Sequence, residues 1–359
     1  MPCLIWGTGY NRKRMFKVFI AETILRNIIL AESQRSNNSR SNLFKVLKMA
    51  RSLYVAIDSL DLAWIKQLKD DYGLVADTTR TDYIKSISTK PELVLKNPSS
   101  LFILDIPIAE AKKIQVEYGV ICRSGVDTNV SILIDVNDEH TTDKNKPLGR
   151  GWDTVLDSVE SLPSNALILT DRYLFKTTNA RYGNGFDNVR SILTELLPRE
   201  LNTTFNITVV FDKDSIDPLY DFQTIAKRLN DIKDEFKRPY PIIMEVLGIT
   251  GKNNAYYNLH NRRIISNYFV VKMDYSLAAF NKAVGTADQT ITPQVLFTED
   301  SLNRHSSAPL KTMEQIVSTL REFSNSLLLP YTKHNSYYYA VNGQWMEKCI
   351  SIRNRLIND

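Results

Sequence analysis

Two stretches of the chain place a polar residue and an arginine two positions apart, a spacing suited to phosphate chemistry. Residues 259–267 read Leu-His-Asn-Arg-Arg-Ile-Ile-Ser-Asn, and residues 169–177 read Leu-Thr-Asp-Arg-Tyr-Leu-Phe-Lys-Thr. In an extended strand, residues two apart share a face, so His260 lies with Arg262, and Thr170 lies with Arg172. A histidine can attack phosphorus, and an arginine can hold two phosphate oxygens. The shared spacing indicates either a degenerate repeat with an offset of 90 residues or a chance echo.

The elements that must position these residues follow from the hydrophobic pattern. From residue 53 onward, short runs of β-branched residues alternate with amphipathic stretches, which predicts an α/β fold with a mixed or mostly parallel sheet covered by helices on both faces. The expected strands are Leu53–Ile57, Leu101–Ile106, Gly119–Arg123, Ser131–Val136, Ala166–Thr170, Asn206–Phe211, Pro241–Val246, Ile264–Lys272 and Ser336–Val341. The expected helices are Leu60–Tyr72, Ile108–Tyr118, Trp152–Ser161, Phe186–Leu197, Pro218–Glu235, Leu310–Leu328 and Trp345–Leu356.

The N-terminal region looks like a separate basic segment. The apolar run Met15–Leu30 contains Lys17, Glu22 and Arg26, so it is too short and too charged to span a bilayer, and an amphipathic docking helix is expected. The polar stretch Glu32–Asn42 is expected to be a linker. The first 52 residues hold ten basic and two acidic residues, which indicates binding to nucleic acid or anionic lipid, or a solvated leader.

These observations predict three parts of the chain. Residues 1–48 form the basic helix and linker, residues 49–180 a first α/β half, and residues 181–359 a second α/β half that carries the His260 motif and the C-terminal helices. The two halves are one degenerate duplication if the repeat is real. At 359 residues, the chain is long enough for two domains.

Composition excludes several classes of protein. The chain is 43% hydrophobic and 24% charged with a net charge of +5, values typical of an ordinary globular protein and not of a disordered chain or a coiled coil. Cys3, Cys122 and Cys349 form no CxxC pair, which disfavours a disulfide scaffold and a zinc ribbon and favours a reducing, cytoplasmic setting. No cofactor motif is present, so no cofactor is expected.

The residues after His260 resemble the signature of the phospholipase D-like superfamily. That signature is His-x-Lys, four residues, then Asp, and His260, Arg262 and Asn267 match its spacing with Lys→Arg and Asp→Asn. The preceding helix–strand–helix–strand order also resembles this fold. The most similar branch is a degenerate one, like the C-terminal domain that accompanies MIT modules. The resemblance implies His260 as nucleophile, Arg262 as phosphate clamp and Asn267 as a weakened orienting residue.

The other half of the catalytic machinery is incomplete by the same resemblance. Thr170 stands where a second histidine would protonate the leaving group, and threonine is a poor proton donor at neutral pH. A homodimer that juxtaposes two copies of His260 would restore the pair. Further phosphate contacts are expected from residues beside the two motifs and from the glycine-containing turn that opens a helix: Arg172, Thr170, Arg263, Gly183 and Gly185.

The predicted function is therefore phosphodiester binding, directed at nucleic acid, with weakened or lost hydrolysis. Nucleic acid and a second copy of the chain are the expected partners, and a membrane surface is disfavoured. Two aromatic pairs beside basic residues are candidates for stacking bases: Tyr256 with Tyr257, and Tyr268 with Phe269, beside Arg262, Arg263 and Lys252. The first alternative is an active, metal-independent nuclease that works as a homodimer through His260.

The second alternative is a metal-dependent nuclease. Carboxylates at the carboxyl edge of a parallel sheet can bind Mg²⁺, although Asp after a strand is also an ordinary capping residue. The strand-end aspartates are Asp58, Asp105, Asp135, Asp171 and Asp212. No metal site is assigned, because capping explains most of them.

Overall fold

The architecture is described from a computed structural model. It describes residues 16–35, 40–50, 53–125, 140–141, 162–176, 184–249, 262–273, 277, 290–296, 310–311, 313–318, 321, 337–346 and 352–358. His260, Asn261, Gly183 and Asp135, and the expected elements Ser131–Val136 and Trp152–Ser161, lie outside the described residues.

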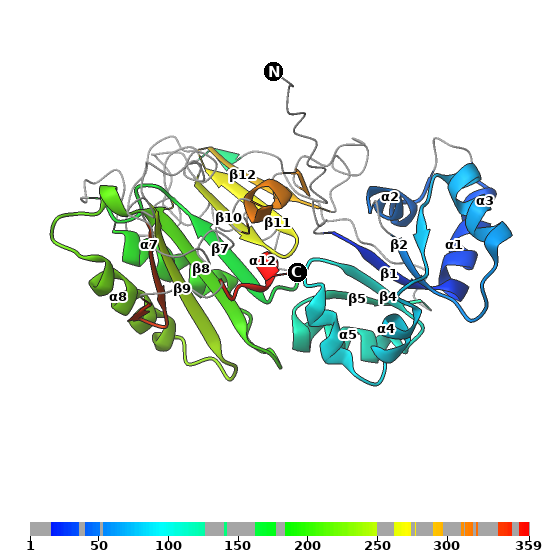
Figure 1. Ribbon diagram of the computed structural model, residues 1–359, viewed down its shortest axis with the longest axis horizontal. Helices are drawn as coiled ribbons and strands as arrows, with labels where there is room; N and C mark the ends of the chain where they lie inside the picture. The colour runs from blue at the N-terminus through cyan, green and yellow to red at the C-terminus, as the bar shows by residue number, and fades with distance from the viewer. Residues whose placement is uncertain are drawn as a thin grey trace, which may run out of the picture.

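The N-terminal sheet is wholly parallel, with the order β3-β2-β1-β4-β5 (Figure 1). Its strands are β1 Val18–Ala21, β2 Leu53–Ala56, β3 Ala76–Asp77, β4 Leu101–Leu104 and β5 Ile121–Ser124. Helices α1 (Glu22–Ser33), α2 (Asn42–Met49) and α3 (Leu62–Tyr72) pack on one face, since their apolar residues share a core with Val18 and Ile20. Helices α4 (Thr81–Ser86) and α5 (Ile108–Tyr118), with the 3₁₀ helix η2 (Pro91–Lys96), pack with Phe19 on the other face.

The C-terminal sheet is mixed, with the order β14-β13-β9-β8-β7-β10-β11-β12-β6. Strands β7 (Ala166–Thr170), β8 (Phe205–Asp212) and β9 (Ile242–Ile249) are parallel, and β10 (Arg262–Ser266) pairs antiparallel with β7. The remaining strands are β6 His140–Thr141, β11 Phe269–Met273, β12 Thr290–Val295, β13 Tyr337–Val341 and β14 Gln344–Trp345, all antiparallel to their neighbours.

Helices α7 (Gly185–Leu196) and α8 (Phe222–Glu235) cover one face of the C-terminal sheet. Asn184 caps α7 by accepting a hydrogen bond from the Phe186 amide, and Asp221 caps α8 in the same way. The opposite face packs against the C-terminal segment that contains α12 (Arg355–Asn358), and the 3₁₀ helix η3 (Lys213–Ser215) follows β8. The α/β class predicted from the sequence is therefore confirmed, with one parallel and one mixed sheet plus helices.

One hydrophobic core runs through both sheets. Ile20 and Leu101 of the N-terminal sheet belong to the same buried cluster as Ile168 and Tyr268 of the C-terminal sheet. At this junction α5 ends at Gly119, whose φ of +62° is left-handed, and a Cβ there would lie 2.3 Å from the Ser164 carbonyl oxygen. Only glycine satisfies both constraints, so the two sheets approach backbone to backbone at this point.

The apolar run expected to be one N-terminal docking helix is instead a central strand followed by a helix. Val18–Ala21 forms β1, between β2 and β4, and α1 begins only at Glu22. Because a central parallel strand is buried on both faces, it has a continuous apolar sequence that resembles a buried helix. The expected division at residues 48 and 180 also differs from the sheets, since β1 belongs to the N-terminal sheet and β7 to the C-terminal one.

Other boundaries differ for local reasons. The single strand expected over Ile264–Lys272 is two strands, because Asn267 and Tyr268 form the turn between β10 and β11. The helix expected over Trp345–Leu356 does not begin at Trp345, because Trp345 belongs to strand β14, which pairs with β13. The polar linker is fixed at both ends, since the buried Glu32 carboxylate accepts hydrogen bonds from the Ser41 amide.

Candidate phosphate-binding site

The two sequence motifs lie side by side in the C-terminal sheet. Strand β10 pairs with β7 so that Arg263 is opposite Thr170 and Ile264 is opposite Leu169. Directly paired residues share a face of a sheet, and successive residues alternate between faces. Arg263 and Thr170 are therefore on one face, and Arg262 is on the other. The echo in the sequence corresponds to neighbouring antiparallel strands.

Arg262 forms an ion pair with a fully buried carboxylate. Its Nε lies 3.4 Å from Oδ1 of Asp171, which follows β7 directly and is 1% exposed. Asp171 also accepts hydrogen bonds from the amides of Tyr173 (2.9 Å) and Leu277 (3.2 Å). Burial raises the pKa of the Asp171 carboxyl, while the Arg262 charge and the two amides oppose that rise. Asp171 thus fixes the position of the Arg262 guanidinium.

A second ion pair sits at the end of the next strand. Arg172 Nε lies 3.4 Å from Oδ2 of Asp212, the last residue of β8. Asp212 also caps η3, because its carboxylate accepts hydrogen bonds from the Asp214 amide (2.9 Å) and the Ser215 hydroxyl (2.8 Å). Two of the strand-end aspartates therefore hold arginines and backbone amides.

Three cations surround one aromatic ring. The Arg172 and Arg262 guanidinium carbons lie 4.9 and 5.8 Å from the Tyr173 ring centroid, and the Lys176 ammonium lies 4.9 Å from it. We refer to Arg172, Tyr173, Lys176 and Arg262 as the Tyr173 cluster. Its two arginines come from the two sequence motifs, and Lys176 is exposed. A ring that attracts cations electrostatically concentrates positive charge at this sheet edge.

Two further cations lie on the face of the C-terminal sheet opposite to Arg262. Arg263 and Lys272 are directly opposed across β10 and β11, and both are partly buried. Burial lowers the pKa of Arg263, and burial together with the Arg263 charge lowers the pKa of Lys272. Thr170 occupies the same face but is 1% exposed, so its hydroxyl is not presented to solvent.

Asn267 has a structural role at the junction of the sheets. Its Oδ1 accepts hydrogen bonds from the amides of Asn165 (3.1 Å) and Ala166 (3.3 Å). Its Nδ2 donates to the Pro98 carbonyl (2.7 Å) and to Oδ1 of Asn165 (3.0 Å). With both polar atoms of its side chain bonded and no exposed surface, the Asn267 side chain has no capacity left to orient a catalytic group.

The neighbouring aromatic pair is buried as well. Tyr268 is fully buried and Phe269 is 3% exposed, so the prediction that these rings stack bases is wrong. Two aromatic residues beside arginines are also the sequence pattern of a surface that binds nucleic acid. In this chain, the turn that carries Tyr268 forms the contact between the two sheets instead.

Gly185 is required by close packing. It begins α7, and a Cβ there would lie 2.0 Å from the Leu174 carbonyl oxygen. The first turn of α7 already has a capping acceptor in Asn184. His260 and Gly183 lie outside the described residues, as do Tyr256, Tyr257 and Lys252, so their expected roles stay predictions.

The four strand-end aspartates that the structure describes lie in two different sheets. Asp171 and Asp212 belong to the C-terminal sheet, whereas Asp58 and Asp105 follow β2 and β4 of the N-terminal sheet. Within the described part of the chain, no three His, Cys, Asp or Glu side chains form a group that could hold a metal ion. Nor does any helix in that part have the length and apolarity needed to cross a bilayer.

Three members of the site were not singled out from the sequence: Tyr173, Lys176 and Lys272. The first two had a visible signal, since Lys176 follows Arg172 by four residues and Tyr173 by three, around a single turn. Lys272 had none, because its proximity to Arg263 depends on the pairing of β10 with β11. Comparison with protein-family models gave no match, and comparison with curated protein sequences gave none either.

Proposed function

We propose that the chain is a phospholipase D-like protein that binds phosphodiesters, with nucleic acid as its ligand and with weakened or lost hydrolysis. The observation that carries the proposal is the Tyr173 cluster, in which Arg172, Lys176 and Arg262 surround one ring. Three cations at one sheet edge suit the closely spaced phosphates of a nucleic-acid strand. The buried partners Asp171 and Asp212 fix both guanidinium groups in place, which lowers the entropy lost on binding.

Lost hydrolysis is supported by two residues. By the resemblance, Thr170 stands where the general acid would be, and it is both a poor proton donor and buried. By the same resemblance, Asn267 stands for the orienting aspartate, and its side chain is bonded to backbone groups and to Asn165. A catalytic mechanism through His260 and a second copy of the chain remains the alternative.

Binding is tested by fluorescence anisotropy with labelled single-stranded and duplex oligonucleotides over a range of salt concentrations. Lys176→Gln removes one exposed cation that forms no ion pair with another described residue. It should weaken binding to all sequences alike and reduce the slope of log K against log salt by about one. Lys112→Gln, an exposed lysine on α5, is the matched control and should change neither quantity. Equal behaviour of the two variants, or binding only to anionic lipid vesicles, would overturn the proposal.

Hydrolysis is tested on the same oligonucleotides. The proposal predicts no turnover with or without EDTA. Cleavage that survives EDTA and is lost in His260→Ala would support the dimeric nuclease. Cleavage that requires Mg²⁺ and is lost in Asp135→Asn would support the metal-dependent alternative.

A further inference from the structure

The N-terminal sheet carries a pocket of about 260 Å³ that the phosphate site does not use. In the order β3-β2-β1-β4-β5 the chain leaves β1 in one direction to reach β2 and β3, and in the other to reach β4 and β5. Wound parallel sheets bind ligands at the carboxyl ends of their strands, where the direction reverses. The pocket lies there, since its lining includes Ala21, Ala56 and Leu104, the last residues of β1, β2 and β4.

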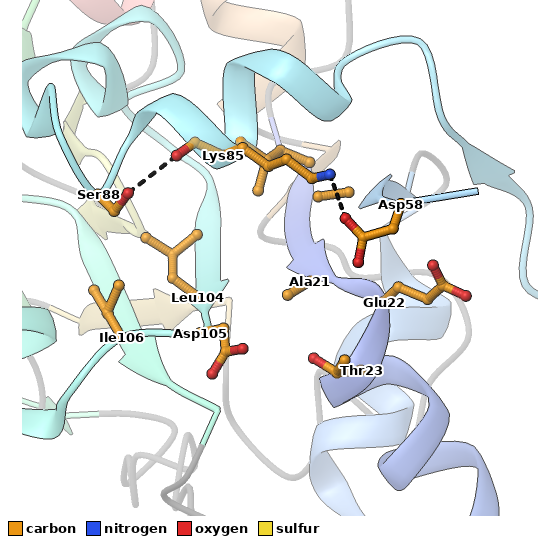
Figure 2. Close-up of a pocket in the computed structure, with 11 residues that line it drawn as sticks. Ala21, Glu22, Thr23, Asp58, Lys85, Ser88, Leu104, Asp105 and Ile106 are labelled. Carbon is orange, nitrogen blue, oxygen red and sulfur yellow. Dashed lines mark hydrogen bonds and ion pairs between the residues drawn. The ribbon is translucent and has the colours of Figure 1, made fainter. Parts of the chain in front are cut away.

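The lining combines an apolar wall with polar groups at the strand ends. Leu104 and Ile106 contribute apolar surface, while Glu22, Asp58, Asp105 and Thr23 contribute oxygen atoms (Figure 2). Ile84 also belongs to the lining, as does Lys85, whose ammonium group is paired with Asp58. Figure 2 shows that Asp105 lies across the pocket from Thr23. An aromatic or aliphatic group can rest on the wall while hydroxyl groups of the same ligand reach the carboxylates.

The three carboxylates differ in how far they are already engaged. Glu22 pairs with Arg26 (2.7 Å), and Asp58 pairs with Lys85 (2.5 Å). Asp105 is exposed and makes no hydrogen bond or ion pair with another described residue. Asp105 is therefore the carboxylate most available to a ligand hydroxyl.

The turn from β1 into α1 disfavours a phosphorylated ligand. Dinucleotide-binding sheets use glycines here so that the phosphates can approach the helix N-terminus. This chain has Ala21-Glu22-Thr23 instead, and Glu22 places a carboxylate at the first position of α1. By contrast, the position after β2, where such sheets bind ribose hydroxyls through an acidic residue, is occupied by Asp58.

We propose that this pocket binds a nucleoside, whose ribose hydroxyls donate hydrogen bonds to Asp105 and Asp58 and whose base packs on the apolar wall. The site is separate from the Tyr173 cluster and selects against a 5′-phosphate. It gives the N-terminal sheet a ligand of its own.

The test is isothermal titration of the full chain with adenosine, guanosine, cytidine and uridine, with their 5′-monophosphates, and with Mg²⁺ alone. At least one nucleoside should bind, and should bind more tightly than its monophosphate. Asp105→Ala should weaken that binding about tenfold, because a charge-assisted hydrogen bond is lost. Asp71→Ala, an exposed aspartate on α3, is the matched control and should bind like the parent chain.

Three results would overturn the proposal. They are the absence of binding by all four nucleosides, tighter binding of the monophosphates, and equal affinity of Asp105→Ala and the parent chain for the nucleoside. If Mg²⁺ releases heat on binding and none of the four nucleosides binds, the proposal is overturned and the pocket is a cation site. Lys176→Gln should leave nucleoside binding unchanged, so failure here is distinguishable from failure of the phosphate site.

Discussion

The hydroxyl of Tyr268 donates a hydrogen bond to the carbonyl of Ser100, 168 positions earlier in the chain, at 2.8 Å. The same oxygen accepts the Ile121 amide at 2.7 Å. One buried tyrosine from the C-terminal sheet thus binds β5 and the residue before β4 in the N-terminal sheet. The turn that this residue shares with Asn267 joins the two sheets. It follows directly after β10, which carries Arg262, so the proposed phosphate site lies next to the junction.

Tyr268→Phe should lower the free energy of unfolding by about 1–3 kcal/mol, because the Ser100 carbonyl and the Ile121 amide would lose a buried partner. Urea denaturation measures the loss, and hydrogen exchange should speed up at the Ile121 amide. Tyr338→Phe is the control, since Tyr338 is 38% exposed, and it should change stability little. Equal stability of Tyr268→Phe and the parent chain would contradict the role of the hydroxyl.

Asn267→Asp restores the residue of the phospholipase D-like signature and should still destabilise the chain. An ionised aspartate cannot donate to the Pro98 carbonyl or to Asn165, and it would bury a charge. We expect a loss of at least about 2 kcal/mol and no hydrolysis of a chromogenic phosphodiester. A gain of hydrolysis with unchanged stability would mean that Asn267 belongs to a catalytic site.

The strands and helices with strong local signals could be predicted from the sequence. Ala166–Thr170 and Ile108–Tyr118 have the bounds expected, because a short β-branched run and a periodic apolar stripe are local patterns. The segment Val18–Ala21 was misassigned because an apolar run buried on both faces has no period to distinguish strand from helix. Its neighbours in the sheet, which decide the matter, are distant in sequence.

The candidate site was predictable only in its arginines. Each arginine lies two positions after a polar residue, which is a local pattern that the sequence shows directly. In the structure, both Arg172 and Arg262 lie beside the Tyr173 ring. Their carboxylate partners depend on which strands pair, so the sequence presented Asp171 as a possible metal ligand or cap and not as the anchor of Arg262. The role of Asn267 was misjudged because a spacing match carries no information on burial.

Stability should depend on pH through Glu245, which is fully buried on β9. Its carboxylate accepts hydrogen bonds from Thr208, Tyr339 and the Arg353 amide, yet burial is the larger effect and raises its pKa. The folded state therefore binds the proton more tightly than the unfolded chain does, and this contribution to stability is lost as the pH rises from the ordinary carboxyl pKa through the raised one.

Urea denaturation between pH 5 and 8 measures this effect, with a slope of at most about 1.4 kcal/mol per pH unit for one group. Glu245→Gln keeps the shape of the side chain, removes the titration and should flatten the profile. The exposed Glu92→Gln should leave the profile of the parent chain intact. A profile that is no flatter in Glu245→Gln would show that other groups set the pH dependence.

Variants of the ion pair between Arg262 and Asp171 distinguish an effect on nucleic-acid binding from an effect on stability. Arg262→Ala leaves a buried carboxylate without its cation and should cost about 3–5 kcal/mol of stability. A loss of nucleic-acid binding in that variant alone would be ambiguous, because part of the population would unfold. Arg262→Ala combined with Asp171→Asn removes both charges, so most of the stability should return.

The double variant keeps the fold and lacks the cation, so it should still bind oligonucleotides more weakly than the parent chain. Asp171→Asn alone keeps the Arg262 cation beside Tyr173 but loses the anion that fixes it, so its affinity should lie between those of the parent chain and the double variant. Denaturation and anisotropy on the four proteins complete the cycle. If the double variant binds as tightly as the parent chain, Arg262 serves the fold alone, and the phosphate contacts must come from Arg172 and Lys176.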